Sequence, residues 1–132
     1  MRRRVAQARV AHLATISPKG TPHIVPVCFA FAGDVIGIAL DDKPKTTTTL
    51  RRFENVRARG VASLLVDQYD EDWSQLWWVR VDARASLVDE GPELEDIVAA
   101  LEEKYRQYGL RSPTAPAILL EPQRWVGWSA SE

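Results

Sequence analysis

The sequence contains one cysteine, Cys28, and only two histidines. A lone cysteine cannot form an internal disulfide, and two histidines far apart give no zinc-binding spacing, so a disulfide scaffold and a structural zinc site are both excluded. No run of about 18 apolar residues occurs, which excludes a membrane-spanning helix. Lysine plus arginine (17) and aspartate plus glutamate (18) nearly cancel. The chain therefore lacks the overall positive charge that non-specific nucleic-acid binding requires, and no nucleic-acid partner is expected.

The remaining composition is that of an ordinary globular protein. Hydrophobic residues make up 45% of the chain and charged residues 27%, so disorder and collagen-like repeats are excluded. A chain of 132 residues is long enough for one core and too short for two full domains. We expect a single domain over residues 1–132, located in the reducing cytoplasm.

The first third of the sequence predicts three β-strands. Residues 9–16, 22–31 and 35–40 are apolar or alternate with period two, and turn-forming residues separate them. Pro26 interrupts the second of these runs, and a proline cannot donate a hydrogen bond to a neighbouring strand. We therefore expect this strand to lie at a sheet edge, to carry a bulge, or to leave its backbone free for a ligand near Pro26.

The rest of the chain alternates helical and strand patterns. Residues 41–59 predict a helix that starts near Pro44 and stops at Gly60, and residues 91–105 predict a second helix. Strands are expected at 61–66 and 76–88, and a last strand, broken at Pro122, at 117–120 and 125–128. The order β-β-β-α-β-β-α-β with hairpin-length turns predicts a mainly β protein, namely a small antiparallel barrel with helices at its rim.

The segment from Lys43 to Arg52 is the strongest candidate for a binding site. Two lysines and four threonines stand where the first predicted helix begins. Ammonium groups, hydroxyl donors and the positive end of a helix dipole are what a phosphate group needs. A solvated, basic helix start is an equally good interpretation of these residues taken alone.

Other candidate groups have ordinary structural interpretations. His12 and His23 are expected to be hydrogen-bonded strand residues, and Asp70 to Asp72 an acidic surface loop. No nucleophile with a neighbouring base and no phosphate-binding glycine loop is present, so no catalytic residue is assigned. Trp77 and Trp78 point to opposite faces of one strand, which predicts that one of them contacts a ligand or another subunit.

Several segments together resemble the flavin and deazaflavin oxidoreductases related to pyridoxamine 5'-phosphate oxidase. The similarity covers nearly the whole chain and is closest to the actinobacterial group of probable F420-dependent enzymes. The segments that carry the resemblance are Arg9 to Ile16, Pro18 to His23, Val25 to Phe29, Asp41 to Thr46, Leu50 to Arg52, Val61 to Asp67, Tyr69 to Ser74 and Leu76 to Val81.

The resemblance implies an FMN-binding-like split β-barrel that forms a homodimer, with the cofactor at the subunit interface. Backbone around Val25, Pro26 and Val27 would line the edge of the cofactor's tricyclic ring. Trp77 or Trp78 of the second subunit would close the site. The cofactor phosphate would be held by four residues: Lys43, Lys45, Thr46 and Thr47.

The function implied is hydride transfer from reduced coenzyme F420 to an unsaturated or conjugated small organic molecule. Arg51 and its neighbours would meet the anionic tail of that cofactor, and Arg80 would steady charge on the acceptor or form a cross-strand ion pair. An FMN-dependent oxidase or reductase of the same fold is one alternative. A non-catalytic split-barrel protein that binds a cofactor or an apolar ligand is another.

Overall fold

The computed structural model describes residues 1–39, 47–105 and 116–131, with the backbone alone for residues 47–50. In chain order, its elements are α1 (Arg2–Gln7), β1 (Ala11–Ile16), β2 (Pro22–Val27), β3 (Ala30–Ala32), β4 (Val35–Ala39), α2 (Thr47–Arg59), β5 (Val61–Gln68), the 3₁₀ helix η1 (Trp73–Gln75), β6 (Trp77–Val88), α3 (Pro92–Lys104) and β7 (Ala117–Ser129).

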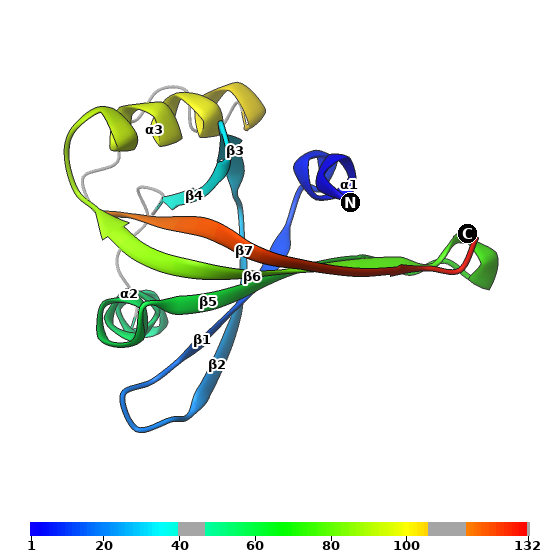
Figure 1. Cartoon of the computed structure of the whole chain (residues 1–132), viewed down its shortest axis with the longest axis horizontal. Coiled ribbons are helices and arrows are strands. Elements are labelled where there is room, and N and C mark those ends of the chain that lie inside the picture. Colours follow the sequence, from blue (N-terminus) through cyan, green and yellow to red (C-terminus); the bar gives the residue numbers. More distant parts are fainter. Residues whose placement is uncertain (40–46, 106–115, 132) are drawn as a thin grey trace.

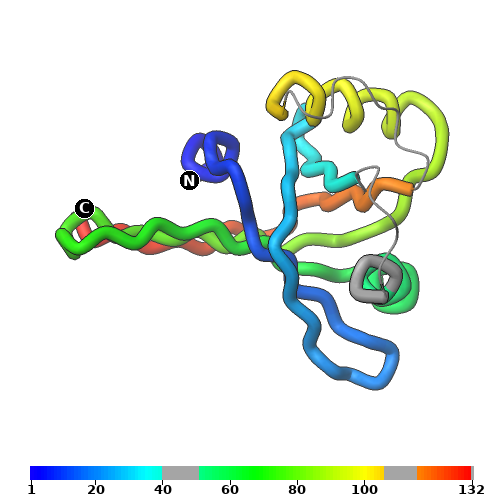
Figure 2. The backbone as a smooth tube through the Cα atoms, turned by 180° about the vertical axis from the view of Figure 1, so that it is seen from behind, coloured from blue at the N-terminus to red at the C-terminus, as the bar shows by residue number. Residues whose placement is uncertain are grey.

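All seven of these strands form one antiparallel sheet in the order β2-β1-β5-β6-β7-β4-β3. The mainly β architecture predicted from the sequence is confirmed. β2 and β3 stand at opposite ends of that order, yet only Cys28 and Phe29 separate them in the chain. Because the three Cα–Cα steps from Val27 to Ala30 span about 10 Å at most, the sheet must curl until its two edges approach each other. The result is a half-barrel, seen from two sides in Figures 1 and 2.

The single strand predicted for residues 22–31 is wrong, because the chain bends after Val27. Phe29 is fully buried at the bend. Its backbone N–H donates to the Tyr105 hydroxyl at 3.3 Å instead of to a strand. A side chain 76 residues away therefore ends β2, and no local sequence signal encodes that contact.

The break predicted at Pro122 is also wrong, because β7 runs without interruption from Ala117 to Ser129. Pro122 pairs with Ala83 and Arg124 pairs with Asp82, so the register shifts by one residue at this point. A β-bulge accommodates the proline without ending the strand.

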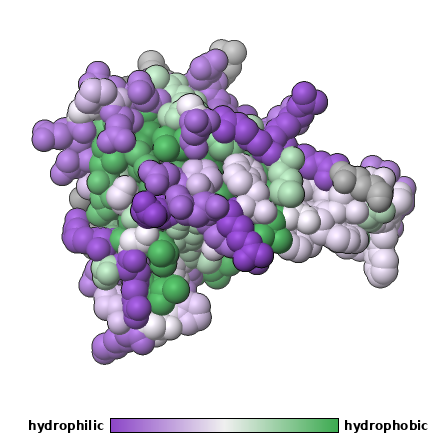
Figure 3. Space-filling model, in the orientation of Figure 1, coloured by the Kyte–Doolittle hydropathy of each residue, from purple (hydrophilic) through white to green (hydrophobic). Residues whose placement is uncertain are grey.

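An arm extends beyond the body of the molecule. It consists of the first half of β6 and the last residues of β5 and β7. Gln68, Trp77 and Ser129 lie side by side at its end, and the arm carries the described C-terminal end of the chain (Figure 1). In the hydropathy view the arm is pale, whereas the helices carry strongly hydrophilic residues (Figure 3). Trp73 and Trp128 are exposed there.

The core lies on the concave side of the sheet in two parts. The larger part packs α1 and α2 against the sheet, and the smaller part lies under α3, which contacts β3 and β4. On β6 the side chains alternate as predicted, with Val79, Val81 and Ala83 buried and the polar residues on the other face. The helix α1 was not expected from the sequence; it is held by the fully buried side chain of Val5. In the part of the chain that the structure describes, no helix has the length and apolar character needed to cross a membrane.

Candidate cofactor-binding site

The strand β2 is an edge strand, which is one of the three arrangements that Pro26 predicted. Val25 and Pro26 pair with Leu13 and His12 of β1, and no described strand pairs with the other side of β2. A proline at this position loses no ladder hydrogen bond on the open side. Residues 25–27 therefore lie at a sheet edge that no other described strand covers.

Two contacts fix α2 against the β1–β2 hairpin. The buried Asn55 side chain donates a hydrogen bond from Nδ2 to Thr15 Oγ1 at 3.1 Å. At the end of the helix, the guanidinium of Arg59 donates to the carbonyl oxygens of Ser17 and Pro18 at 3.0 and 2.9 Å. Gly60 then ends α2 with a positive φ of 69°, as its place in the sequence predicted.

A cavity of about 480 Å³ lies between this hairpin and α2. Lys19 and Arg51 bring two cationic side chains to it, and Glu54 brings one carboxylate. Its lining residues are Ser17, Pro18, Lys19, Thr21, Pro22, His23, Arg51, Glu54 and Asn55. The surplus of cations makes it suited to an anionic group.

His23 is the member of this cavity that the sequence interpretation missed. Its Nδ1 atom is buried and has no hydrogen-bond partner among the described residues. Nearly all buried polar atoms in native proteins have a partner, so a lone one requires an explanation such as a bound ligand or water. We had expected an ordinary hydrogen-bonded strand histidine. The sequence holds no signal for the difference, because it depends on how α2 packs over β2.

The predicted phosphate-binding residues are only partly described. Lys43, Lys45 and Thr46 lie outside the described residues, and of Thr47 the structure gives the backbone as the first residue of α2. Arg51 lies about one turn further along α2 and lines the cavity. The structure therefore brings Arg51 together with His23, two residues before Val25 on β2.

Trp77 and Trp78 lie apart from this cavity within one chain. Two strands, β1 and β5, separate β2 from β6 in the sheet. Trp77 packs against the larger core, and the Arg4 guanidinium lies 5.0 Å from its ring centroid. Trp78 lines a separate cleft of about 370 Å³ with Trp128, its partner on β7, and with Arg3 and Arg4. Any contact of Trp78 with a ligand in the first cavity would have to come from a second subunit.

Arg80 is held by a carboxylate on its own strand. Its Nε and Nη2 atoms donate to Asp82 at 2.8 and 3.1 Å, and Ser63 donates from Oγ to the same carboxylate at 2.8 Å. These hydrogen bonds lower the pKa of Asp82. The ion pair that we expected across two strands thus forms along β6, and the cross-strand contact comes from Ser63.

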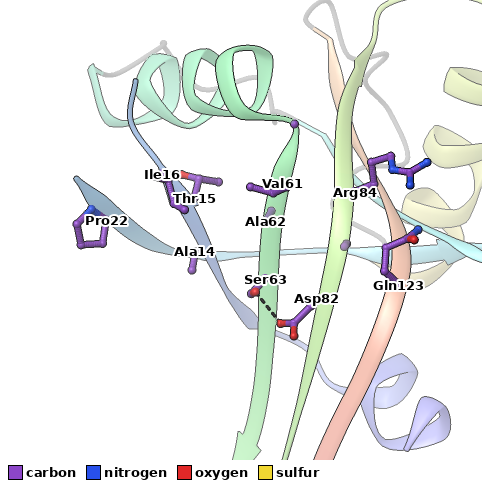
Figure 4. A pocket seen from close by; sticks show the side chains of 12 residues that line it. Ala14, Thr15, Ile16, Pro22, Val61, Ala62, Ser63, Asp82, Arg84 and Gln123 are labelled. Atoms are coloured by element: carbon purple, nitrogen blue, oxygen red, sulfur yellow. Dashed lines mark hydrogen bonds between the residues drawn. The ribbon is translucent and has the colours of Figure 1, made fainter. Parts of the chain in front are cut away.

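The Ser63–Asp82 contact lies at a second cavity, of about 540 Å³, on the convex face of the sheet (Figure 4). Small and apolar side chains such as Ala14, Ile16 and Val61 line most of it. Ile16 and Val61 are 39% and 46% exposed, and Ile24 is 64% exposed. This face of β1, β2 and β5 is therefore apolar and uncovered in the described chain.

The acidic segment after β5 is a capped turn. Asp70 accepts a hydrogen bond from the Asp72 backbone, and Asp72 accepts from both the backbone and the hydroxyl of Ser74. These contacts to Ser74 lower the pKa of Asp72. Within the described ranges no group of three or more His, Cys, Asp or Glu side chains is placed to hold a metal ion.

The curled sheet defines the fold class as a split β-barrel. Comparison with known proteins agrees with this class. The family model described as "Pyridoxamine 5'-phosphate oxidase" matches residues 1–129. The chain belongs to this family. No curated protein sequence matches the chain.

Solved structures of the same fold come from several bacteria. A conserved hypothetical protein from Mycobacterium tuberculosis superposes with a TM-score of 0.79 at 20% identity, covering 97% of this chain and 81% of that one. A protein described as FAD-binding from Mesorhizobium loti gives 0.71 at 16% identity, covering 96% and 89%. HutZ, a haem storage protein from Vibrio cholerae, gives 0.67 at 16% identity, covering 92% and 85%. At these identities the superpositions show the fold alone.

Proposed function

We propose that this protein is an oxidoreductase that binds coenzyme F420 and directs its hydride to an unsaturated or conjugated small organic molecule. The observation that carries the proposal is the cavity between β2 and α2, which Lys19, Arg51 and His23 line beside an open strand edge. This arrangement belongs to a chain of the pyridoxamine 5'-phosphate oxidase family.

The residues present fit an anionic, ring-bearing cofactor. His23 lines the cavity, and its buried Nδ1 would be satisfied by a hydrogen-bonding group of the cofactor that reached it. Arg51 supplies a charge-assisted contact. In this proposal Lys43, Lys45, Thr46 and Thr47 hold the phosphate at the start of α2. The backbone of Val25, Pro26 and Val27 lies along the ring edge, because β2 leaves it free of a neighbouring strand.

In this proposal two copies of the chain complete the site. The convex face of β1, β2 and β5 is apolar and uncovered, and the arm carries exposed Trp73 and Trp128. Surfaces of this kind mark contacts with another protein. A second copy packed there would bring Trp77 or Trp78 towards the ring, which neither residue reaches within its own chain.

Reduced coenzyme F420 supplies the hydride when bound, so the chain itself needs no nucleophile or metal. Arg51 and the segment before it bind the anionic part and fix its position. The β2 edge orients the ring, and the indole groups exclude water from the space beside it. Positioning of this kind turns a two-molecule encounter into a one-molecule step.

Two alternatives are favoured by specific relatives. The Mesorhizobium loti structure is of a protein described as FAD-binding, which favours a flavin such as FMN in the same cavity. HutZ is described as a haem storage protein, which favours a non-catalytic role. A flavin enzyme would prefer FMN over the deazaflavin, and a storage protein would bind its ligand without turnover.

The experiment that tests the reaction mixes the protein with reduced coenzyme F420 under anaerobic conditions. A panel of conjugated ketones, quinones and nitro compounds then serves as hydride acceptors, and reoxidation of the chromophore is followed. Reoxidation that scales with protein concentration supports the enzyme. Binding of the cofactor without reoxidation by any acceptor supports the storage role instead.

A further inference from the structure

The cleft of about 370 Å³ between the start of the chain and the arm is a separate space from the proposed cofactor cavity. Met1, Arg3 and Arg4 line it on one side, and residues 78–79 of β6 and 127–129 of β7 line it on the other. It shares no lining residue with the cavity between β2 and α2. Its volume lies within the range of small-molecule sites, about 300–1,000 Å³. We call it the α1–arm cleft.

The α1–arm cleft carries positive charge that no neighbouring carboxylate compensates. Arg3 makes no hydrogen bond, ion pair or ring contact with any described residue. The guanidinium of Arg4 lies 5.0 Å from the centroid of the Trp77 ring and has no ion pair within the described ranges. No aspartate or glutamate is among the residues that line the cleft. Two arginines without an acidic partner attract an anionic group.

The arm side of the cleft is largely apolar and closely packed. Val79 is buried, and Trp78 pairs with Trp128 across β6 and β7. Gly127 stands in the interior of β7, where an added Cβ would lie 3.0 Å from Met1 Sδ and 3.3 Å from the Trp78 carbonyl oxygen. A glycine inside a strand marks a place where another group approaches the backbone closely. The start of the chain therefore lies directly on the arm, and the cleft has an apolar wall opposite its cationic one.

We propose that the α1–arm cleft is a binding site for a small aromatic molecule that carries a carboxylate. The guanidinium of Arg3 donates two parallel hydrogen bonds to the carboxylate, a geometry that suits this pair of groups, and Arg4 adds a second positive charge. The aromatic ring lies against the apolar residues of the arm. The bound molecule joins α1 to the arm. This site does not depend on the binding of coenzyme F420.

The first test measures whether the cleft recognises both the charge and the ring. The protein without added cofactor is titrated by isothermal calorimetry with 2-naphthoate, with its neutral analogue 2-naphthamide, and with acetate, which lacks the ring. We expect 2-naphthoate to bind about tenfold or more tightly than either of the other two compounds, because each of them loses one kind of contact. Equal affinities for 2-naphthoate and 2-naphthamide, or no binding of 2-naphthoate, would overturn the proposal.

The second test places the bound molecule. Arg3 is exposed and contacts no described residue, so Arg3→Gln should fold as the wild type does, and circular dichroism checks this. The variant should bind 2-naphthoate about tenfold or more weakly, because it loses a charge-assisted hydrogen-bond donor. Arg51→Gln is the matched change in the other cation-lined cavity and should bind 2-naphthoate with wild-type affinity. A loss in Arg51→Gln and none in Arg3→Gln would place the molecule in the cofactor cavity and contradict the proposal.

A third measurement needs no variant. Amide hydrogen exchange is followed with and without saturating 2-naphthoate. Exchange should slow in α1 and at residues 127–129, because the molecule joins these two walls, while the hairpin residues 17–23 of the other cavity should exchange as before. Unchanged exchange in α1, or slowing confined to the hairpin, would show that the cleft is not the site. Because no cofactor is present, failure of these tests leaves the proposed function to be decided by its own experiments.

Discussion

Asn55 of α2 donates a hydrogen bond from its side-chain nitrogen to the hydroxyl of Thr15 on β1, over 3.1 Å, and both side chains are at most 4% exposed. This pair joins the helix that carries Arg51 to the hairpin that carries His23. The shape of the candidate cavity thus depends on a polar contact inside an apolar core.

Asn55→Ala is expected to lower the free energy of unfolding by about 1–3 kcal/mol, because it leaves the Thr15 hydroxyl buried without its partner. Urea denaturation measures this change. The double variant Asn55→Leu with Thr15→Val removes both polar groups and should be more stable than Asn55→Ala. Asn55→Leu and Thr15→Val are also measured singly. If the double variant loses as much stability as these two single variants added together, the hydrogen bond is not the cause.

Gly37 of β4 lies directly beneath Ile97 of α3. A Cβ atom at position 37 would come 2.7 Å from Ile97 Cγ1, closer than real Cβ atoms approach a carbon. Gly37→Ala is therefore expected to destabilise the protein by about 1–3 kcal/mol through overpacking. Ile97→Ala removes both γ carbons that the new Cβ would meet, so the double variant should lose less stability in thermal melting than the sum of the two single losses. If the two substitutions are simply additive, the two residues are not in contact.

The stability of the protein should depend on the protonation of Lys104. Burial lowers the pKa of Lys104 in the folded state to about 8, whereas in the unfolded chain its value is near 10.5. The unfolded chain therefore binds this proton more tightly, and the cost of burying the cation is fully present below pH 8. The free energy of unfolding of the wild type, minus that of Lys104→Met, should rise between pH 8 and 10.5. A flat or falling difference would contradict the assigned shift.

Arg51 should contribute to cofactor affinity while its helix neighbour Arg57 should not. Both side chains are exposed on α2, but only Arg51 lines the cavity beside His23. Loss of one charge-assisted contact corresponds to about a ten- to hundredfold weaker Kd for coenzyme F420 in Arg51→Ala. Arg57→Ala is the matched control and should bind as the wild type does. Equal losses in both variants would show a general charge effect.

The sequence predicts those parts of the fold that depend on local patterns. The alternation from Trp77 to Leu87 identified the buried face of β6, and an edge strand was one of the three arrangements that Pro26 predicted, because both depend on backbone geometry that a few neighbouring residues set. Gly60 likewise marked the end of α2.

The parts that sequence analysis missed depend on distant contacts. The bend after Val27 requires Tyr105, and α1 is held through Val5 in a core assembled from the whole sheet. The same holds in the candidate site. Arg51 was predicted from local charge, whereas the unpartnered nitrogen of His23 results from the packing of α2 over the hairpin.

The binding of coenzyme F420 tests the central claim most directly. The purified protein is titrated separately with coenzyme F420 and with FMN while tryptophan fluorescence is followed, because indole groups close to the ring should be quenched on binding. We predict a Kd in the micromolar range or tighter for coenzyme F420 and much weaker binding of FMN. Preference for FMN would support the alternative of an FMN-dependent enzyme of the same fold. If neither coenzyme F420 nor FMN binds, the proposed cofactor site is contradicted.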